Sequence, residues 1–589
     1  MQVKKLSITS LDRDKDSDCF FDKWCLSYDE LFFPKSKEYV NHAFVFDKRF
    51  HLESDRNTKL AYKKFLIIIS NILNKKISRC FPIDFWEIII GHWLRQYLDV
   101  VYQRYEHVKS INFSGYRVEV ICPDAEIVPF DCDEFSTWIF GDYLNHQIIG
   151  QIIVAQSLCE HACIKPGVDI KNVKKLGRPR RNRLLLKLAA SLSRIMCRNS
   201  RTIIANGYVS KTLLIRNFIK RRWTPVVYAP RYKRKALSLD RLARELVFSN
   251  ITCDEHSDFE KVALTLLSRN FPIIFFEEIE ELIKEGENSF PNNLKMCITA
   301  NPNSLGELFK VWIAFSRLKN HGKFIIIQHG SNYGQSIVNS DEDVELGTCD
   351  LYLSSGWKDD TKSNQFPDKI IPSASAARLS GVAPYNMSIF SNKSGKFGLL
   401  ILASFPRYYY TGWSAPQGSN FKNYLNGIEK LYISVESKFR KSLMVRDYHY
   451  DYGWHDRKYL EGKGLVFFNT KRRISLSKLM KKSSYNIFTY NSTALNESLV
   501  KNYVTLCMWN PDEWAWRKSA IPALSALKEA SIFHETPESL AQFLNSFESE
   551  YDLRIWWASV KVQLAREVFC ASFANNELDE DVQWSSILE

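Results

Sequence analysis

The stretch IIIQHGSNYG places polar side chains directly after an apolar run that is typical of a buried strand. Gln328 and His329 follow the expected strand, and Gly330 and Gly334 would allow the backbone to approach a ligand closely. His329 could act as a general acid or base, or donate a hydrogen bond to a phosphate or carboxylate. The alternative is a structural histidine in a tight turn. We predict a functional loop.

A hydroxyl-bearing turn joins another expected strand to a helix within residues 483–509. Asn491, Ser492 and Thr493 stand where the helix begins, so free N–H groups, two hydroxyls and the helix dipole would hold one phosphate. Glu497, one turn into the helix, could accept hydrogen bonds from ribose hydroxyls. The alternative is an N-cap that serves only the helix. The strand, turn, helix and strand in succession favour a nucleotide site.

Arg446 ends a third expected strand and precedes a loop rich in Asp, Tyr, His and Trp. Its guanidinium could bind a phosphate or a carboxylate through two parallel hydrogen bonds. The aromatic side chains could pack on a sugar or a base. A purely structural role fits the sequence equally well.

The N-terminal part offers further acids, bases and cations. His92 and Arg95 lie three residues apart on one expected helix face, where they could bind an acceptor. Glu134 and Asp142 are our nominees for a base or a nucleophile, and His146 follows on the same stretch. The Asp-Cys-Asp triplet nearby matches a metal-binding pattern, but similar acidic triplets recur along the chain as solvated surface. We therefore expect no metal and no other cofactor.

The order of apolar runs and turns predicts the elements that position these residues. Residues 84–108 have the apolar spacing of a helix, with Asp84 as its N-cap, and residues 116–121 alternate as a strand does. From residue 271 onward the expected order of strand, polar loop and helix recurs. The same order resumes after a junction at residues 384–396 that is rich in turn-forming residues. Such alternation favours parallel, doubly wound sheets.

We expect an α/β fold of the GT-B type, in which two Rossmann-like domains face a cleft and helices are added to the N-terminal half. The acceptor-binding domain is expected to span residues 1–390, and the nucleotide-sugar-binding domain residues 391–545. Helices within residues 546–589 could pack back on the N-terminal domain.

The chain of 589 residues carries a net charge of +14, which could attract nucleic acid, anionic lipid or phosphorylated substrates. No nucleic-acid-binding motif accompanies this charge, so we expect no nucleic acid partner. Thirteen dispersed cysteines and the lack of a signal segment indicate a cytoplasmic protein. The basic, leucine-rich segment 174–198 suggests peripheral contact with the inner membrane or a lipid-linked acceptor, or else a solvated helix with a buried leucine face.

The ordered motifs FDKWCLSY, FWEIIIGHWL, DYLNHQ, QHGSNYG, VRDYHYDYGW and YNSTALNES resemble a bacterial family of surface-carbohydrate transferases. Members of that family typically have glycines where this chain has Ser331 and Asn332, and an apolar residue at Asp447. These differences bear on how closely the backbone can approach a ligand. The resemblance extends over most of the chain.

The resemblance implies a GT-B enzyme of capsule or O-antigen assembly that takes a CMP-activated acidic keto-sugar, such as a pseudaminic or sialic-type acid or Kdo. It leaves open whether the reaction inverts or retains the anomeric configuration. Two alternatives remain: a teichoic-acid-type polyol phosphotransferase with a CMP-linked donor, and a non-catalytic glycan-binding protein. The expected catalytic residues are His329, Glu134 and Asp142; the donor-binding residues are Gln328, Gly330, Arg446, Asn491, Ser492, Thr493 and Glu497; and the acceptor- or sugar-binding residues are His92, Arg95, His146 and Tyr333.

Overall fold

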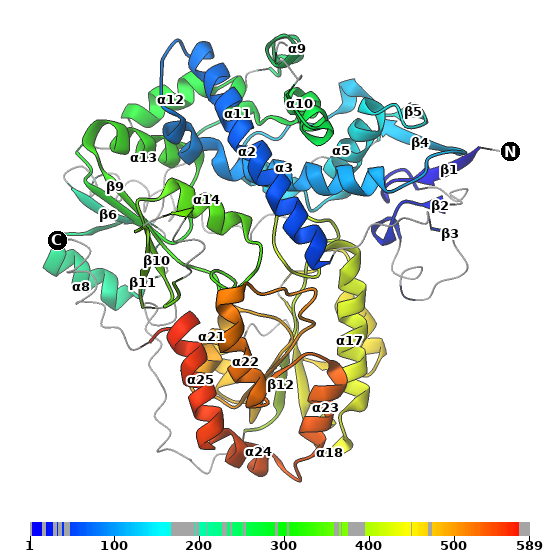
Figure 1. Ribbon diagram of the computed structural model, residues 1–589, viewed down its shortest axis with the longest axis vertical. Helices are drawn as coiled ribbons and strands as arrows, with labels where there is room; N and C mark the ends of the chain where they lie inside the picture. Colours follow the sequence, from blue (N-terminus) through cyan, green and yellow to red (C-terminus); the bar gives the residue numbers. More distant parts are fainter. Residues whose placement is uncertain are drawn as a thin grey trace.

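The structure is a computed structural model that describes most of the chain (Figure 1). The described residues are 3–13, 19–26, 32, 38–39, 47–166, 195, 200–205, 207, 209–226, 232–235, 238–249, 251, 255–288, 293–302, 305–358, 365–366, 368–374, 395–448, 450–468 and 474–576. The basic segment 174–198 and the junction 384–396 lie almost entirely outside these ranges, so both remain sequence predictions.

Three parallel sheets organise the described residues, and the first is near the N-terminus. Its strand order is β3-β2-β1-β4-β5, with every pairing parallel. Its strands and neighbouring helices are β1 (Lys4–Ser7), β2 (Cys19–Phe20), η1 (Lys23–Cys25), β3 (Glu38–Tyr39), α2 (Lys48–Lys76), α3 (Ile83–Lys109), β4 (Tyr116–Ile121), η2 (Pro123–Ala125), α4 (Cys132–Trp138), α5 (Asp142–Ala155) and β5 (Glu160–Ile164).

The second, central sheet has the order β11-β10-β9-β8-β6-β7 and is also parallel. Ile325, Ile326 and Ile327 are β-branched and buried, as a central strand requires. Its elements are β6 (Thr202–Ala205), α8 (Lys211–Arg221), β7 (Thr224–Val226), α9 (Arg241–Ser249), α10 (Asp258–Asn270), α11 (Ile273–Phe276), α12 (Ile279–Asn288), β8 (Met296–Thr299), α13 (Glu307–Asn320), β9 (Lys323–Ile327), α14 (Ser340–Thr348), β10 (Leu351–Ser354) and β11 (Ile370–Pro372).

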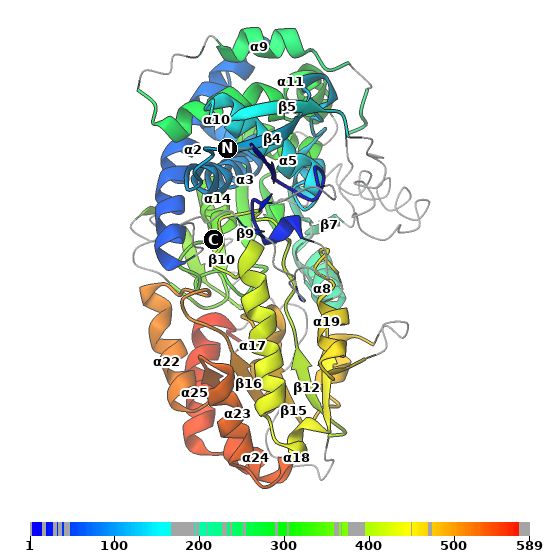
Figure 2. The same ribbon diagram turned by 90° about the vertical axis from the view of Figure 1, so that its right-hand side faces the viewer.

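The third sheet forms the C-terminal domain, which lies at the lower end of the molecule in Figure 2. Its order is β14-β13-β12-β15-β16-β17, the 3-2-1-4-5-6 order of a doubly wound nucleotide-binding fold. Its elements are β12 (Gly398–Ile401), η5 (Gly418–Asn420), α17 (Phe421–Ser434), α18 (Ser437–Arg440), β13 (Leu443–Arg446), α19 (Asp456–Gly462), β14 (Val466–Phe467), α20 (Leu476–Met480), β15 (Tyr485–Phe488), α21 (Thr493–Val500), β16 (Thr505–Met508), η6 (Lys518–Ala520), α22 (Ile521–Glu529), β17 (Phe533–His534), α23 (Pro537–Asn545), α24 (Glu550–Trp557) and α25 (Val560–Phe573).

The expected α/β, GT-B-like fold is confirmed: two six-stranded, doubly wound parallel sheets lie in tandem, with helical additions in the N-terminal half. Residues 1–390 hold the first sheet as well as the central one. The apolar run at residues 273–276 was expected to be a strand, and this prediction is wrong. It forms the short helix α11, in which all four side chains are buried.

Helix α3 lies at the centre of the N-terminal half and packs against α2, α5, α13 and α14 (Figure 1). It is buried along most of its length, yet it carries His92, Arg95, Gln96 and Asp99. Buried polar groups are costly unless they have partners, so each of these side chains needs a bond or a ligand. In the described part of the chain, no helix has both the length and the hydropathy to span a membrane.

The C-terminal helix α25 packs against α21 and α22 of the C-terminal domain. Only its end reaches the central sheet, where Asn575 N–H donates to the Ser355 carbonyl at 3.0 Å. The sequence suggested that these last helices could pack back on the N-terminal domain. Among the described residues, the main contacts of α25 are with α21 and α22, and packing of the last helices on the N-terminal domain stays a prediction.

Candidate active site

A cavity of about 370 Å³ lies between the carboxyl edge of the central sheet and the loop that follows β12. His329 after β9 and Asn301 after β8 form one wall, and His92 and Gln96 of α3 form another. Residues 410–413, from the C-terminal domain, close the cavity from the opposite side. Ligands bind outside the carboxyl ends of parallel strands in such folds, so this cavity is the candidate active site.

His329 lines the cavity, as the sequence predicted, and lies against a buried carboxyl group. Its Nδ1 is 3.9 Å from Oε1 of Glu345, which also accepts a 3.1 Å hydrogen bond from the Tyr333 hydroxyl. Burial lowers the pKa of His329 to about 4 and raises the pKa of Glu345 well above its usual range. The imidazole is therefore neutral at physiological pH and able to accept a proton.

Gln328 does not face the cavity, in contrast to its predicted donor-binding role. Its side-chain oxygen accepts hydrogen bonds from Ser355 N–H at 2.9 Å and Trp357 Nε1 at 2.7 Å, and its amide donates to the Gly330 carbonyl at 2.6 Å. Gln328 is buried, and both its side-chain oxygen and its amide nitrogen bond to other protein groups. The residue therefore holds the loop after β9 in place. Gly330 and Tyr333 do line the cavity.

His92 is the second histidine of the cavity. Its side chain is only 8% exposed, and its Nδ1 lies 3.9 Å from Asp341 Oδ1. Neither ring nitrogen has a hydrogen-bond partner among the described residues. Burial, together with nearby Lys310 and His329, lowers the pKa of His92 well below its usual value. An unpaired imidazole on a cavity wall is suited to a ligand, and the acceptor-binding role of His92 stays a prediction.

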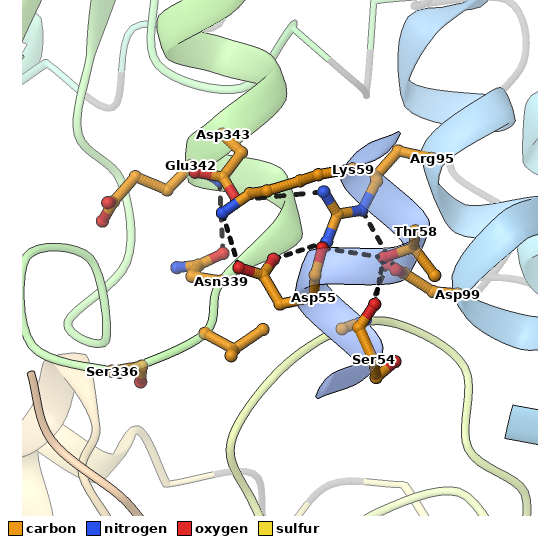
Figure 3. Close-up of polar contacts among 12 residues, drawn as sticks. Ser54, Asp55, Thr58, Lys59, Arg95, Asp99, Ser336, Asn339, Glu342 and Asp343 are labelled. Atoms are coloured by element: carbon orange, nitrogen blue, oxygen red, sulfur yellow. Dashed lines mark hydrogen bonds and ion pairs between the residues drawn. The ribbon is translucent and has the colours of Figure 1, made fainter. Parts of the chain in front are cut away.

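Arg95 lies in a buried ion-pair network rather than in the cavity, which corrects its predicted acceptor-binding role (Figure 3). Its Nε donates to Asp99 at 3.0 Å and its Nη2 donates to Asp55 at 2.8 Å. Lys59 pairs with Asp55 at 2.6 Å and with Asp343 at 2.8 Å. The network connects α2, α3 and α14.

Replacing Arg95 with Met should cost about 3–5 kcal/mol of unfolding free energy, because it leaves Asp99 buried without its cation. Equilibrium urea unfolding measures this loss. A double replacement, Arg95→Met with Asp99→Asn, should recover part of it, since the uncompensated charge is then gone. A variant that keeps wild-type stability but loses transfer activity would restore the acceptor-binding interpretation.

Two further predicted residues, both carboxylates, lie outside the cavity lining. Glu134 lies in the first turn of α4, and its carboxylate accepts a hydrogen bond from Phe130 N–H, just before that helix, at 2.9 Å. Asp142 accepts from Ser10 Oγ at 2.7 Å and from the Tyr408 hydroxyl, so it is held in a contact between domains. These two carboxylates were the nominated base or nucleophile. The carboxylates that do line the cavity are Asp133 and Asp341.

His146 is a structural histidine and not an acceptor-binding residue. It is fully buried, with Nδ1 2.8 Å from Thr9 Oγ1 and Nε2 2.9 Å from the Glu119 carbonyl oxygen. Burial lowers its pKa to about 4. Both ring nitrogens of His146 form hydrogen bonds to residues at the first sheet, so neither is available to a ligand.

The predicted nucleotide turn lies at the carboxyl end of β15. Ser492 caps α21 by accepting from Leu495 N–H at 3.1 Å, and Thr493 is exposed at the first position of the helix. Glu497 accepts from Ser477 Oγ at 2.7 Å and pairs with Lys501 at 2.8 Å. A ribose would therefore compete with protein partners for Glu497, whereas Thr493 is accessible.

Arg446 ends β13, as expected, and its Nη1 lies 3.1 Å from Asp447 Oδ1. Asp447 also pairs with Arg457 at 3.2 Å. The carboxylate that replaces the apolar residue of the resembling family thus lies between two guanidinium groups. Arg446 is partly exposed at the carboxyl edge of the C-terminal sheet, where a phosphate or carboxylate could reach it.

The segment that follows β9 and carries His329 contacts the turn that follows β15. Asn491 Nδ2 donates to Gln335 Oε1 at 2.6 Å, although Asn491, Ser492 and Thr493 do not themselves line the 370 Å³ cavity. This contact brings the segment after β9 and the turn after β15 to the same side of the molecule.

The two domains are also joined through buried polar bonds. Glu342 accepts from Arg517 of the C-terminal domain at 2.8 Å, and Asp99 accepts from Gly412 N–H at 2.9 Å. Figure 3 shows Glu342 and Asp99 with the ion-pair network of Arg95 and Lys59. The bond from Gly412 to Asp99 holds residues 410–413 against α3, where they close the cavity.

Among the residues described here, no group of three or more His, Cys, Asp or Glu side chains is placed to hold a metal ion. The expectation that the reaction needs no metal remains a prediction.

Comparisons with known proteins give the following similarities. A solved structure of the wall teichoic acid polymerase TagF is similar with a TM-score of 0.32 and 11% identity, over 72% of this chain and 97% of that chain. A search of curated proteins finds no sequence match. A family model described as LIC12162 family transferase matches residues 5–588. The chain therefore belongs to the LIC12162 family of transferases.

Proposed function

We propose that this transferase moves an acidic keto-sugar from a CMP-activated donor to a bacterial surface polysaccharide. The observation that carries the proposal is the cavity whose lining combines two partly buried, neutral imidazoles, His92 and His329, with residues 410–413 of a second nucleotide-binding-type domain. Membership in a transferase family supports group transfer at this site. The choice of a CMP-linked acidic sugar rests on the resemblance of the sequence motifs.

The strand order of the C-terminal sheet supports a nucleotide site in that domain. The order reverses between β12 and β15, and nucleotides bind at such a switch point, outside the carboxyl ends of the strands. The loop after β12 supplies residues 410–413 of the cavity, and the loop after β15 leads to Thr493 at the start of α21. A donor with its single phosphate near Thr493 would thus direct its sugar towards the cavity.

His329 is suited to the proton transfer that glycosyl transfer requires. The acceptor hydroxyl oxygen forms a bond to the anomeric carbon while the bond from that carbon to the phosphate oxygen breaks. CMP leaves with the electron pair, and His329 takes the hydroxyl proton. Hydrogen-bond donors on the cavity wall would stabilise the departing charge. Glu134 and Asp142 have no part in this mechanism, because neither lines the cavity.

A CMP-release assay across a panel of CMP-sugars tests the proposal. We expect acceptor-dependent release of CMP with an acidic keto-sugar donor, and a product that contains the sugar but no phosphorus. Phosphorus in the product would instead indicate a polyol phosphotransferase. Glycan binding without CMP release from any donor would contradict an enzymatic function and favour a binding protein. The His329→Ala variant is the control for release that does not arise at this site.

A further inference from the structure

Lys310 of α13 is a buried cation on the wall of the active-site cavity that the sequence analysis did not single out. The residue is only 3% exposed and lines the cavity together with Cys132 and His92. Its Nζ is 3.8 Å from the Cys132 sulfur, which places the ammonium group at that wall. This is the only hydrogen bond that Lys310 makes with the described residues.

The ammonium group of Lys310 has no ion-pair partner within 4.0 Å in the described part of the chain. Burial raises the pKa of Cys132 well above its usual value, which favours the neutral thiol. Two nearby carboxylates accept backbone hydrogen bonds, Asp131 from Glu134 N–H at 2.8 Å and Glu307 from Cys132 N–H at 3.2 Å, and the carboxylate of Asp133 lines the same cavity. Although burial opposes the charge, Cys132, Glu307, Asp133 and Asp131 raise the pKa of Lys310 and keep it protonated.

A buried ammonium group with no ion-pair partner within 4.0 Å in the described part of the chain is suited to a ligand that supplies an opposite charge in direct contact. We propose that Lys310 and His92 form an anion subsite that binds a compact oxyanion of the substrate within the cavity. If the proposed function is correct, on which this identification rests, the oxyanion is the carboxylate of the acidic sugar. A substrate phosphate has the same chemistry and is the other source to be distinguished.

Calorimetric titration without any CMP donor tests the subsite. The probes are N-acetylneuraminate, its uncharged methyl ester and inorganic phosphate. We expect wild-type protein to bind the acid on the order of 10- to 100-fold more tightly than the ester, a loss typical of one hydrogen bond to a charged group. Lys310→Met should bind the acid as weakly as the ester, and Lys310→Arg should recover part of the affinity.

Lys319→Met is the matched control, because Lys319 lies on the same helix but is exposed and pairs with Glu287 at 2.6 Å. It should bind all three probes as the wild type does. Lys310-dependent binding of phosphate, with no preference for the acid over the ester, would assign the subsite to a phosphate. Equal binding of the acid by Lys310→Met and wild type, or no binding of the acid and phosphate by wild type, would overturn the proposal.

Thermal unfolding without ligand separates an anion subsite from a structural ion pair. Lys310→Met should unfold at the same or a higher temperature than wild type, because an uncompensated buried charge has been removed. A clear decrease would show that Lys310 stabilises the fold through an internal partner, which contradicts the subsite. Failure of CMP release with every donor, alongside Lys310-dependent binding of the acid, would refute the proposed function and leave the subsite in place.

Discussion

Replacing His329 with Ala should lower kcat by about 10²–10⁴-fold, the usual effect of removing a general base. The imidazole lines the cavity, is held neutral by burial, and lies beside the buried Glu345 carboxyl group. Steady-state rates of CMP release with saturating donor and acceptor measure the change. The thermal unfolding midpoint should stay within a few degrees of wild type, which shows that the loss is chemical.

His161→Ala is the matched control, since His161 is exposed on β5 in the first sheet, and it should keep wild-type turnover. The pH profile gives a second readout. A base acts when it is neutral, so kcat/KM should persist as pH falls and decline only near the pKa of about 4 of His329, not near the ordinary value of 6.5. Wild-type turnover by His329→Ala would refute the assignment.

Replacing Gly334 with Ala should lower the unfolding free energy by about 2–5 kcal/mol, combining left-handed backbone strain with overpacking. Gly334 has φ of +73°, and an added Cβ would lie 2.4 Å from the Trp357 ring. Trp357 cannot move away freely, because its Nε1 donates to the buried Gln328 side chain. Activity should fall with stability, since the same loop carries His329. Urea unfolding and CMP release measure the two effects.

Gly462→Ala is the comparison for this variant. Gly462 ends α19, and an added Cβ there would meet nothing within 4 Å. Its stability should change by no more than about 1 kcal/mol. A Gly334→Ala protein as stable as Gly462→Ala would show that the loop can relax, and that the glycine is not needed for its conformation.

Long periodic segments could be predicted well from the sequence, and short apolar ones could not. The helix expected at residues 84–108 is α3, Ile83–Lys109, with Pro82 rather than Asp84 at the N-cap. The run at 273–276 was assigned to a strand because four apolar residues fit a buried strand as well as a buried helix. The strands β2 and β3 have two residues each, too few to show any period.

Residues of the candidate site could be predicted where they follow a local pattern. His329 after a strand and His92 on a helix face were both predicted from the sequence, and both line the cavity. Arg95 and Asp142 lie elsewhere than predicted because part of their contacts comes from residues distant in sequence: besides the nearby Asp99, Arg95 pairs across 40 residues with Asp55, and Asp142 pairs across 266 residues with Tyr408. No one-dimensional pattern reveals such pairings.

Lys310 and Glu345 were missed for a different reason, since each is one charged residue whose role depends on complete burial. A signal for Lys310 does exist in the sequence. It is the only charged residue between Glu307 and Arg317 in an otherwise apolar stretch of α13. A lone ammonium group at such a position is costly to bury, which favours a ligand contact.

The anchoring of residues 409–412 on α3 limits how substrates can enter. Gln96 donates to the Tyr410 carbonyl at 3.0 Å, and Arg104 donates to the Tyr409 carbonyl at 2.8 Å. Together with the bond from Gly412 to Asp99, these contacts would all have to break at once if the lobes swung apart. We therefore expect donor and acceptor to enter an active-site cavity that is already assembled. A hinge motion of the two domains should not limit the rate of catalysis.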